Sequence, residues 1–148
     1  AWVVSSARLD AAGLARARAL LSQVSVVADC RAALRAGVRE RGVTALHDAT
    51  EGGVLGGLLE LARACGHDLA VERARIPLSP EARAACEVFG TDPYWTLSEG
   101  TLIATARPAR AGAVLAALAA AGIPGAEVGE VVPGIGTLRL AEPGGATS

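Results

Sequence analysis

The sequence contains no lysine and no methionine, and it is poor in aromatic residues. All fourteen basic residues are arginine, and the formal net charge is −1. With no excess of positive charge and only 3% aromatic residues, the chain lacks the basic surface and stacking platforms typical of nucleic-acid-binding proteins. Because the chain begins at Ala1 rather than at a methionine, we expect it to be a domain excised from a longer protein.

Cysteine pairs and long apolar runs are also missing. Cys30, Cys65 and Cys86 are odd in number and widely spaced, so we expect small buried apolar residues of a cytoplasmic protein rather than disulfides or zinc ligands. No apolar run reaches the roughly eighteen residues of a membrane span, and no signal peptide opens the chain. With 51% hydrophobic residues and a length of 148, the chain predicts one globular domain over residues 1–143, followed by a loose tail at 144–148.

Short β-branched runs and helical runs alternate along most of the chain, which favours an α/β or α+β sandwich with a mixed sheet covered by helices. Ser79 and Pro80 are typical of a helix start, and Gly134-Ile135-Gly136 predicts a hairpin between the last two strands. In the second helix, a buried stripe of Val26, Cys30, Ala33, Leu34 and Val38 is expected. Predicted strands cover residues 2–6, 43–48, 68–74, 101–108, 126–133 and 136–143; predicted helices cover 9–23, 26–42, 53–65, 80–90 and 109–122.

The most unusual stretch is "HDATEGGVLGGLLELARACG", residues 47–66, which places four glycines at the start of a predicted helix. Glycine in a helix costs about 1 kcal/mol relative to alanine. Gly52 and Gly56 are four residues apart, as are Gly53 and Gly57, so both pairs should share a helix surface without side chains. Amide groups in the first turn lack intrahelical partners and favour an anion. The stretch is neither a P-loop nor a G-x-G-x-x-G motif.

Two structural interpretations of the same residues remain open. Asp48 could cap the helix, with Glu51 completing a capping box, while the glycines pack against the sheet. His47 and Glu51 are four apart, which makes a metal site conceivable, but no second ligand cluster accompanies them. We therefore favour a hydrogen-bonded histidine at the end of a buried strand, and we assign no metal ligand and no catalytic residue.

Four segments of the chain, taken in order, resemble the C-terminal domain of AIR-synthase-related proteins. They cover nearly the whole sequence, and the match is most similar to the hydrogenase-maturation branch of that superfamily, which carries a similar D-x-T-x-G-G motif before a helix. The segments are "LSQVSVVADCRAAL", "VTALHDATEGGVLGGLLELARACG", "IPLSPEARAACEVFGTDPYWTLSEGTLIATARP" and "AEVGEVVPG".

The resemblance implies a sandwich with partly ferredoxin-like topology and an ATP-dependent chemistry in which the γ-phosphate activates an oxygen or selenide. It places Asp48, Thr50, Glu51, Gly52 and Gly53 on one wall of the nucleotide or substrate cleft. It also implies that ATP and Mg²⁺ bind the full-length protein. A missing N-terminal domain is expected to supply most Mg²⁺-binding acids and the homodimer interface. The resemblance therefore implies that this domain alone is inactive.

Two departures from the hydrogenase-maturation branch limit how far the resemblance extends to a substrate. That branch ends in a modified cysteine, whereas this chain ends in "GGATS", and Glu51 replaces a common arginine. The leading hypothesis is therefore the C-terminal domain of an ATP-dependent enzyme of unassigned substrate. The alternatives are a non-catalytic interaction or dimerisation module, with Ile123, Val131 and Ile135 as a docking strip, and a small-ligand-binding regulatory domain.

Overall fold

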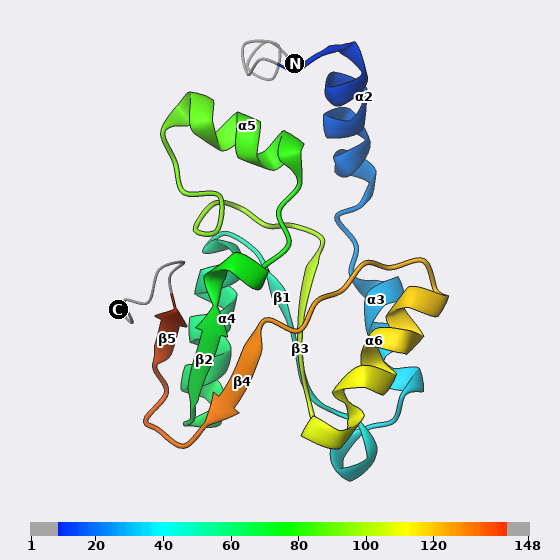
Figure 1. The fold of residues 1–148 in the computed structure, drawn as a ribbon, viewed down its shortest axis with the longest axis vertical. Coiled ribbons are helices and arrows are strands. Elements are labelled where there is room, and N and C mark those ends of the chain that lie inside the picture. The colour runs from blue at the N-terminus through cyan, green and yellow to red at the C-terminus, as the bar shows by residue number, and fades with distance from the viewer. Residues whose placement is uncertain (1–8, 142–148) are drawn as a thin grey trace.

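The computed structural model describes residues 9–141, in which helices and strands are interspersed as the sequence predicts (Figure 1). The expected strand at 2–6 and the expected tail at 144–148 lie outside this range. Within residues 9–141, no helix has both the length and the apolarity needed to cross a membrane. The helices are α2 (Ala11–Ala19), α3 (Val27–Arg35), α4 (Gly53–Cys65), α5 (Pro80–Phe89) and α6 (Ala111–Ala120), and the strands are β1 (Val43–Ala49), β2 (Asp68–Glu72), β3 (Thr101–Ala106), β4 (Gly129–Val132) and β5 (Leu138–Ala141).

The strands divide between two sheets that share one helix. Strands β1 and β3 form an antiparallel pair, while β2 lies between an antiparallel β4 and a parallel β5. Helix α4 packs against both sheets and carries Leu55 and Leu58 into the main core, where they meet Leu69, Val71 and Ile103. Burying each of these large side chains contributes about 1.5–3 kcal/mol. The mixed α/β class is confirmed, and α4 is its central element.

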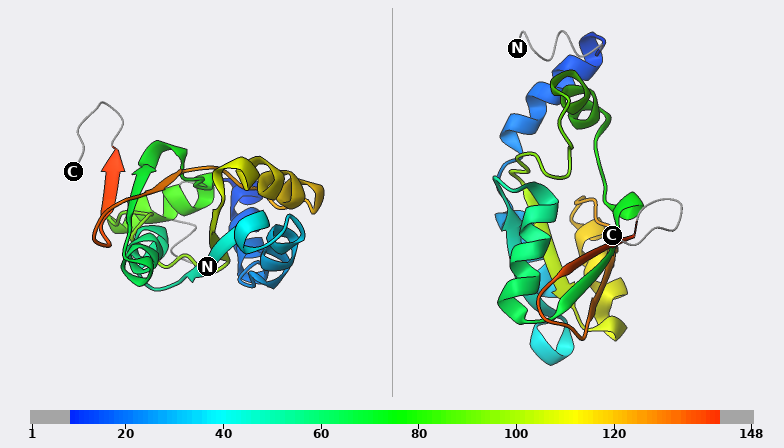
Figure 2. Two further views of the ribbon diagram at one scale, coloured as in Figure 1. Left: turned by 90° about the horizontal axis from the view of Figure 1, so that it is seen from below. Right: turned by 90° about the vertical axis from the view of Figure 1, so that its left-hand side faces the viewer.

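A second core lies on the opposite face of the β1–β3 pair, which α3 and α6 cover (Figure 2). Ala33 is fully buried there, together with Val43 and Val114. The predicted stripe of the second helix is correct at Ala33 but wrong at Leu34 and Val38, which are 41% and 46% exposed.

The predicted helix 26–42 is too long, because α3 ends at Arg35. Gly37 follows with a φ of +109°, a left-handed value that favours glycine, and its carbonyl accepts the Val43 amide at 2.9 Å. That bond turns the chain back toward β1, so Val38 forms a bridge with Val43 rather than a helical contact.

The predicted hairpin between the last two strands is wrong, because β2 separates β4 from β5. Asp68, at the start of β2, is only 2% exposed, and its Oδ1 accepts the amides of Ile135, Gly136 and Thr137 at 2.9, 3.1 and 2.9 Å. Its Oδ2 lies 2.5 Å from the guanidinium of Arg139 on β5. These bonds hold the loop between β4 and β5 over the start of β2. As a result, β5 pairs with the edge of β2 opposite to the one that β4 occupies.

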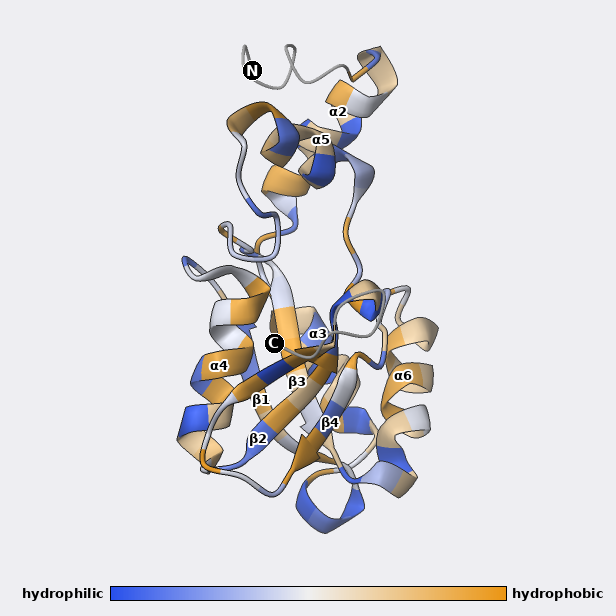
Figure 3. Cartoon of the chain, turned by 60° about the vertical axis from the view of Figure 1, so that its left-hand side comes forward, coloured by the Kyte–Doolittle hydropathy of each residue, from blue (hydrophilic) through white to orange (hydrophobic). Residues whose placement is uncertain are grey.

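Helices α2 and α5 lie side by side beyond the ends of the sheets (Figure 3). The expected start of α5 is confirmed, since the Ser79 hydroxyl accepts the Ala82 amide at 3.1 Å and Pro80 follows. The guanidinium of Arg16 on α2 lies 2.6 Å from the buried carboxylate of Glu81 and lowers the pKa of that carboxyl. This ion pair joins α2 to α5.

We predict that Asp68→Asn lowers stability at neutral pH and weakens the response to acid. The Thr137 amide, with the Ile135 amide and Arg139, holds the pKa of Asp68 far below its usual value of about 3.9. The stabilisation is therefore complete above about pH 4 and is lost as the pH falls toward the folded-state pKa. Urea-unfolding midpoints measured from about pH 7 to about pH 2 should fall less steeply for the variant than for the parent chain.

The matched control for this experiment is Glu72→Gln in the same strand. Glu72 is exposed and forms a surface ion pair with Arg75 at 3.2 Å, so its loss should change the midpoints little. Equal acid sensitivity of Asp68→Asn and the parent chain would contradict the proposed role of the Asp68 carboxylate.

Candidate functional site

The turn between β1 and α4 holds three of the five predicted site residues, while Asp48 lies in β1 and Gly53 is the first residue of α4. The Thr50 carbonyl accepts the amides of Gly53 and Ser98 at 3.0 and 3.1 Å, and Gly52 is the N-cap of α4 without any side-chain cap. The alternative capping box of Asp48 and Glu51 is therefore wrong. Asp48 is still part of the β1–β3 ladder, where it pairs with Leu102, and is too early in the chain to cap a helix that begins at Gly53.

The four glycines serve two different purposes rather than one shared surface. A Cβ at Gly53 would lie 2.4 Å from the Tyr94 carbonyl oxygen, and a Cβ at Gly57 would lie 2.8 Å from the Ile103 side chain. Gly53 and Gly57 therefore allow close packing, the first against the loop at Tyr94 and the second against Ile103 of β3. In contrast, Gly52 is exposed, and a Cβ at Gly56 would have no neighbour within 4 Å beyond its own helix. Only the Gly52–Gly56 pair leaves bare backbone open to a ligand.

A loop after α5 covers the start of α4. The Leu55 amide donates to the Tyr94 carbonyl at 3.0 Å, and Asp92 Oδ1 accepts the Tyr94 amide at 2.9 Å. The guanidinium of Arg73 lies 2.6 Å from Asp92 Oδ2 and 4.9 Å from the centre of the Tyr94 ring. Asp92 and Arg73 are not among the residues predicted from the sequence. The Asp-Pro-Tyr order is typical of an Asx turn and could have indicated Asp92, but no local signal links Arg73 to it.

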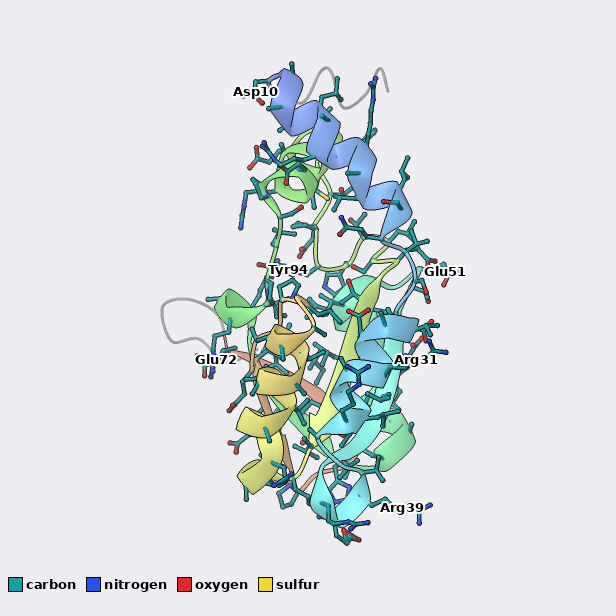
Figure 4. All side chains as sticks on the ribbon, turned by 90° about the vertical axis from the view of Figure 1, so that its right-hand side faces the viewer. Asp10, Arg31, Arg39, Glu51, Glu72 and Tyr94 are labelled. Carbon is teal, nitrogen blue, oxygen red and sulfur yellow. The ribbon has the colours of Figure 1, made fainter. Side chains whose placement is uncertain are left out.

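The exposed part of the turn is negatively charged. Glu51 is exposed and projects from the body on the same side as α3 (Figure 4). The Thr50 hydroxyl and the Glu51 amide both bond its carboxylate and lower its pKa, so the group is ionised at neutral pH. Asp48 is exposed too. Their oxygens are the donors that a Mg²⁺ ion prefers, although residues 9–141 contain no group of three side chains that could hold a metal alone.

His47 is hydrogen-bonded at its strand, as we expected. Its Nε2 lies 2.7 Å from the Glu60 carboxylate on α4, and its side chain is 32% exposed. The histidine therefore joins β1 to α4.

One shallow hollow, of about 140 Å³, lies beside α3 and includes Asp48 but not the Glu51–Gly52 turn. Its lining is Val26, Cys30, Leu46, His47, Asp48 and Leu102. A larger hollow, of about 340 Å³, lies on the three-stranded sheet and includes Glu72, Glu130 and Arg139 but none of the predicted site residues. The candidate site is therefore the exposed β1–α4 turn together with Asp48 near the end of β1.

Comparison with known proteins finds one family along most of the chain. The description "AIR synthase related protein, C-terminal domain" applies to the family model that matches residues 4–140. The carbamoyl dehydratase HypE of Escherichia coli is 41% identical over 102 residues, which are 68% of this chain and 30% of that protein.

Solved structures of hydrogenase maturation proteins also match this chain. The crystal structure of E. coli HypE matches with a TM-score of 0.71 and 35% identity, over 83% of this chain and 37% of that one. A structure of the hydrogenase maturation protein HypE in complex with ATP matches with a TM-score of 0.66 and 27% identity, over 72% and 34% of the two chains. The chain thus spans about a third of the length of the relatives that it matches.

We predict opposite effects of alanine at two glycines of α4. Gly53→Ala should destabilise the chain by about 2 kcal/mol or more, because φ is +67° and the new Cβ would overlap two carbonyl groups. Gly56→Ala should stabilise it by about 0.5–1 kcal/mol, because the site is open and helical. Urea unfolding of both variants measures the difference, and a Gly53→Ala variant as stable as the parent would contradict the packing described here.

Proposed function

Because the chain belongs to the AIR synthase related proteins, as their C-terminal domain, we propose that it forms one wall of an ATP- and substrate-binding cleft. A second domain completes that cleft, and the chain alone is inactive. The proposal is carried by one observation: the Glu51–Gly52 turn is exposed and free of bulky side chains, although it opens a helix whose other contacts are tightly packed. A relative of 27% identity has been crystallised with ATP, which supports a nucleotide as the ligand.

Backbone is the part of this wall that a phosphate would meet. Gly52 carries no side chain, and Gly56 behind it leaves the space open. The Gly53 amide already donates to the Thr50 carbonyl, so it could meet a phosphate only if that bond opens, and we propose that the Gly52 amide makes the contact. The N-terminal end of α4 adds its dipole, which favours an anion by about 0.3–1 kcal/mol.

The charge of Glu51 decides how a phosphate could be held. Two unit charges of the same sign at about 4 Å repel by about 1 kcal/mol in water and about 4 kcal/mol near a protein surface. This repulsion offsets the dipole term, so the turn favours a phosphate only when a cation neutralises Glu51. A bound Mg²⁺ would reverse the sign of this interaction, and we propose that the carboxylates of Glu51 and Asp48 would hold the Mg²⁺ of Mg·ATP.

We propose that the whole protein uses ATP to activate an oxygen of its substrate, as the sequence resemblance implies. The relative named carbamoyl dehydratase supports a dehydration as the overall reaction. The described residues of this chain contain no group of three metal ligands, so further acids must come from the second domain. In this proposal the protein is a cytoplasmic homodimer whose N-terminal domain supplies those acids and the dimer contact.

A second candidate function is a docking module without catalysis, and one observation favours it. Ile135 is 89% exposed although the Asp68 carboxylate holds its backbone, and Val131 on β4 is 46% exposed. Ile123, the third residue of the predicted strip, is half-buried and follows α6 rather than β4. Light scattering of the chain separates the two candidates: a tight dimer that Mg·ATP does not change, and that Ile135→Ser dissociates, would favour docking.

We predict that Glu51→Gln changes ATP binding with a sign that depends on Mg²⁺. In the full-length protein, the variant should bind Mg·ATP about tenfold more weakly than the parent, because a charged contact to the ion is lost. Without Mg²⁺ it should bind ATP as well as the parent or better, because a repulsion is removed. Isothermal titration calorimetry in the two conditions measures both affinities.

Glu87→Gln, at an exposed position on α5, is the matched control and should leave both affinities unchanged. Gly52→Val tests the backbone contact separately and should weaken Mg·ATP binding. If Glu51→Gln and Gly52→Val both bind Mg·ATP like the parent, this wall does not contact the nucleotide.

A further inference from the structure

We propose that Arg73 and Asp92 are positioning residues that set the direction of the Glu51–Gly52 turn through Tyr94. We call Arg73, Asp92 and Tyr94 the clamp. Neither charged residue belongs to the turn itself, which they reach through the loop that covers the start of α4. The inference rests on the proposed function, because it assigns a role in holding the wall that meets Mg·ATP.

Asp92 fixes the shape of the covering loop from within. Its Oδ1 accepts the Tyr94 amide at 2.9 Å, and its carbonyl accepts the Trp95 amide at 3.2 Å and the Thr96 hydroxyl at 2.7 Å. One residue therefore bonds three successive residues of the loop. As a result, the carbonyls of Tyr94 and Thr96 both lie against Gly53 at the start of α4.

Arg73 attaches this loop to the three-stranded sheet. It begins η3 (Arg73–Arg75), directly after β2, and its guanidinium both pairs with Asp92 and lies over the Tyr94 ring. The side chains of Arg73 and Asp92 are only 26% and 32% exposed, so solvent and salt screen this pair less than a fully exposed one. Stacking adds a second contact that a lysine could not reproduce with the same geometry.

The loop in turn holds the start of α4. The Tyr94 carbonyl accepts the Leu55 amide at 3.0 Å, which satisfies a first-turn donor that no side chain caps. The carbonyls of Tyr94 and Thr96 lie 2.4 and 2.6 Å from the Cβ position of Gly53, so only a left-handed glycine fits there. The direction in which Gly52 and Glu51 leave the helix is therefore set by the loop rather than by a cap within the turn.

The chain offers a matched pair of arginines in one short helix to test the clamp. Arg73→Ala removes both clamp contacts, whereas Arg75→Ala removes only an exposed ion pair with Glu72 at 3.2 Å. Arg73→Lys keeps the charge without the planar stacking. Asp92→Asn keeps an oxygen for the Tyr94 amide but loses the ion pair. Each variant is compared with the parent in the 148-residue chain and in the full-length protein.

Two readouts separate positioning from general stability. Amide hydrogen exchange in the 148-residue chain reports the Leu55 bond directly, with the Leu61 amide in the middle of α4 as the internal reference. Arg73→Ala should accelerate exchange at Leu55 about tenfold and leave Leu61 unchanged, while Arg75→Ala changes neither. In the full-length protein, Mg·ATP affinity should fall several-fold for Arg73→Ala, less for Arg73→Lys, and not for Arg75→Ala.

The outcomes distinguish this inference from the proposed function. Unchanged exchange at Leu55 in Arg73→Ala, or equal acceleration at Leu55 and Leu61, would overturn the clamp. Faster exchange at Leu55 in Arg73→Ala, with the Mg·ATP affinity of the parent, would overturn the positioning role. In that case, weaker Mg·ATP binding by Glu51→Gln would still support the proposed cleft wall. If Glu51→Gln and Gly52→Val bind Mg·ATP like the parent, the proposed function fails and the positioning role fails with it, whatever Leu55 shows.

Discussion

The close approach of the Tyr94 and Thr96 carbonyls to Gly53 is the constraint on which the candidate site depends. Only a residue without a Cβ, held at φ +67°, fits beneath those two oxygens. The contact sets where α4 begins, and α4 in turn supplies the side chains that join both sheets in the main core. A single glycine thereby connects the packing of the interior to the shape of the exposed turn.

Two carboxylates hold loops of this chain in place by accepting hydrogen bonds from backbone amides. Asp68, at the start of β2, and Asp92, shortly after α5, each accept backbone amides while an arginine neutralises the second oxygen. A charged acceptor bonds amides more strongly than a neutral one, and the arginine offsets the cost of burying the charge. Loops fixed in this way need few apolar contacts of their own, which suits a chain with so few aromatic residues.

Local signals predicted the parts of the fold that depend on neighbouring residues. The start of α5 at Ser79-Pro80 and the left-handed Gly66 that ends α4 both follow from backbone chemistry within a few positions. The order of β4, β2 and β5 could not be predicted in this way, because it depends on Asp68 bonding residues almost seventy positions later. Glycine spacing indicated the turn, but only three-dimensional contacts show that Gly53 and Gly57 pack while Gly52 and Gly56 stay open.

The parallel pairing of β5 with β2 has a consequence for synthesis on the ribosome. Leu138 and Leu140 of β5 pack on the main core beside Leu69 and Val71 of β2, yet they are translated about seventy residues later. Until β5 emerges, one edge of β2 stays unpaired and the apolar side chains beneath it remain exposed. The nascent chain therefore passes through a stage with an open strand edge, in which chaperone binding would protect it from aggregation.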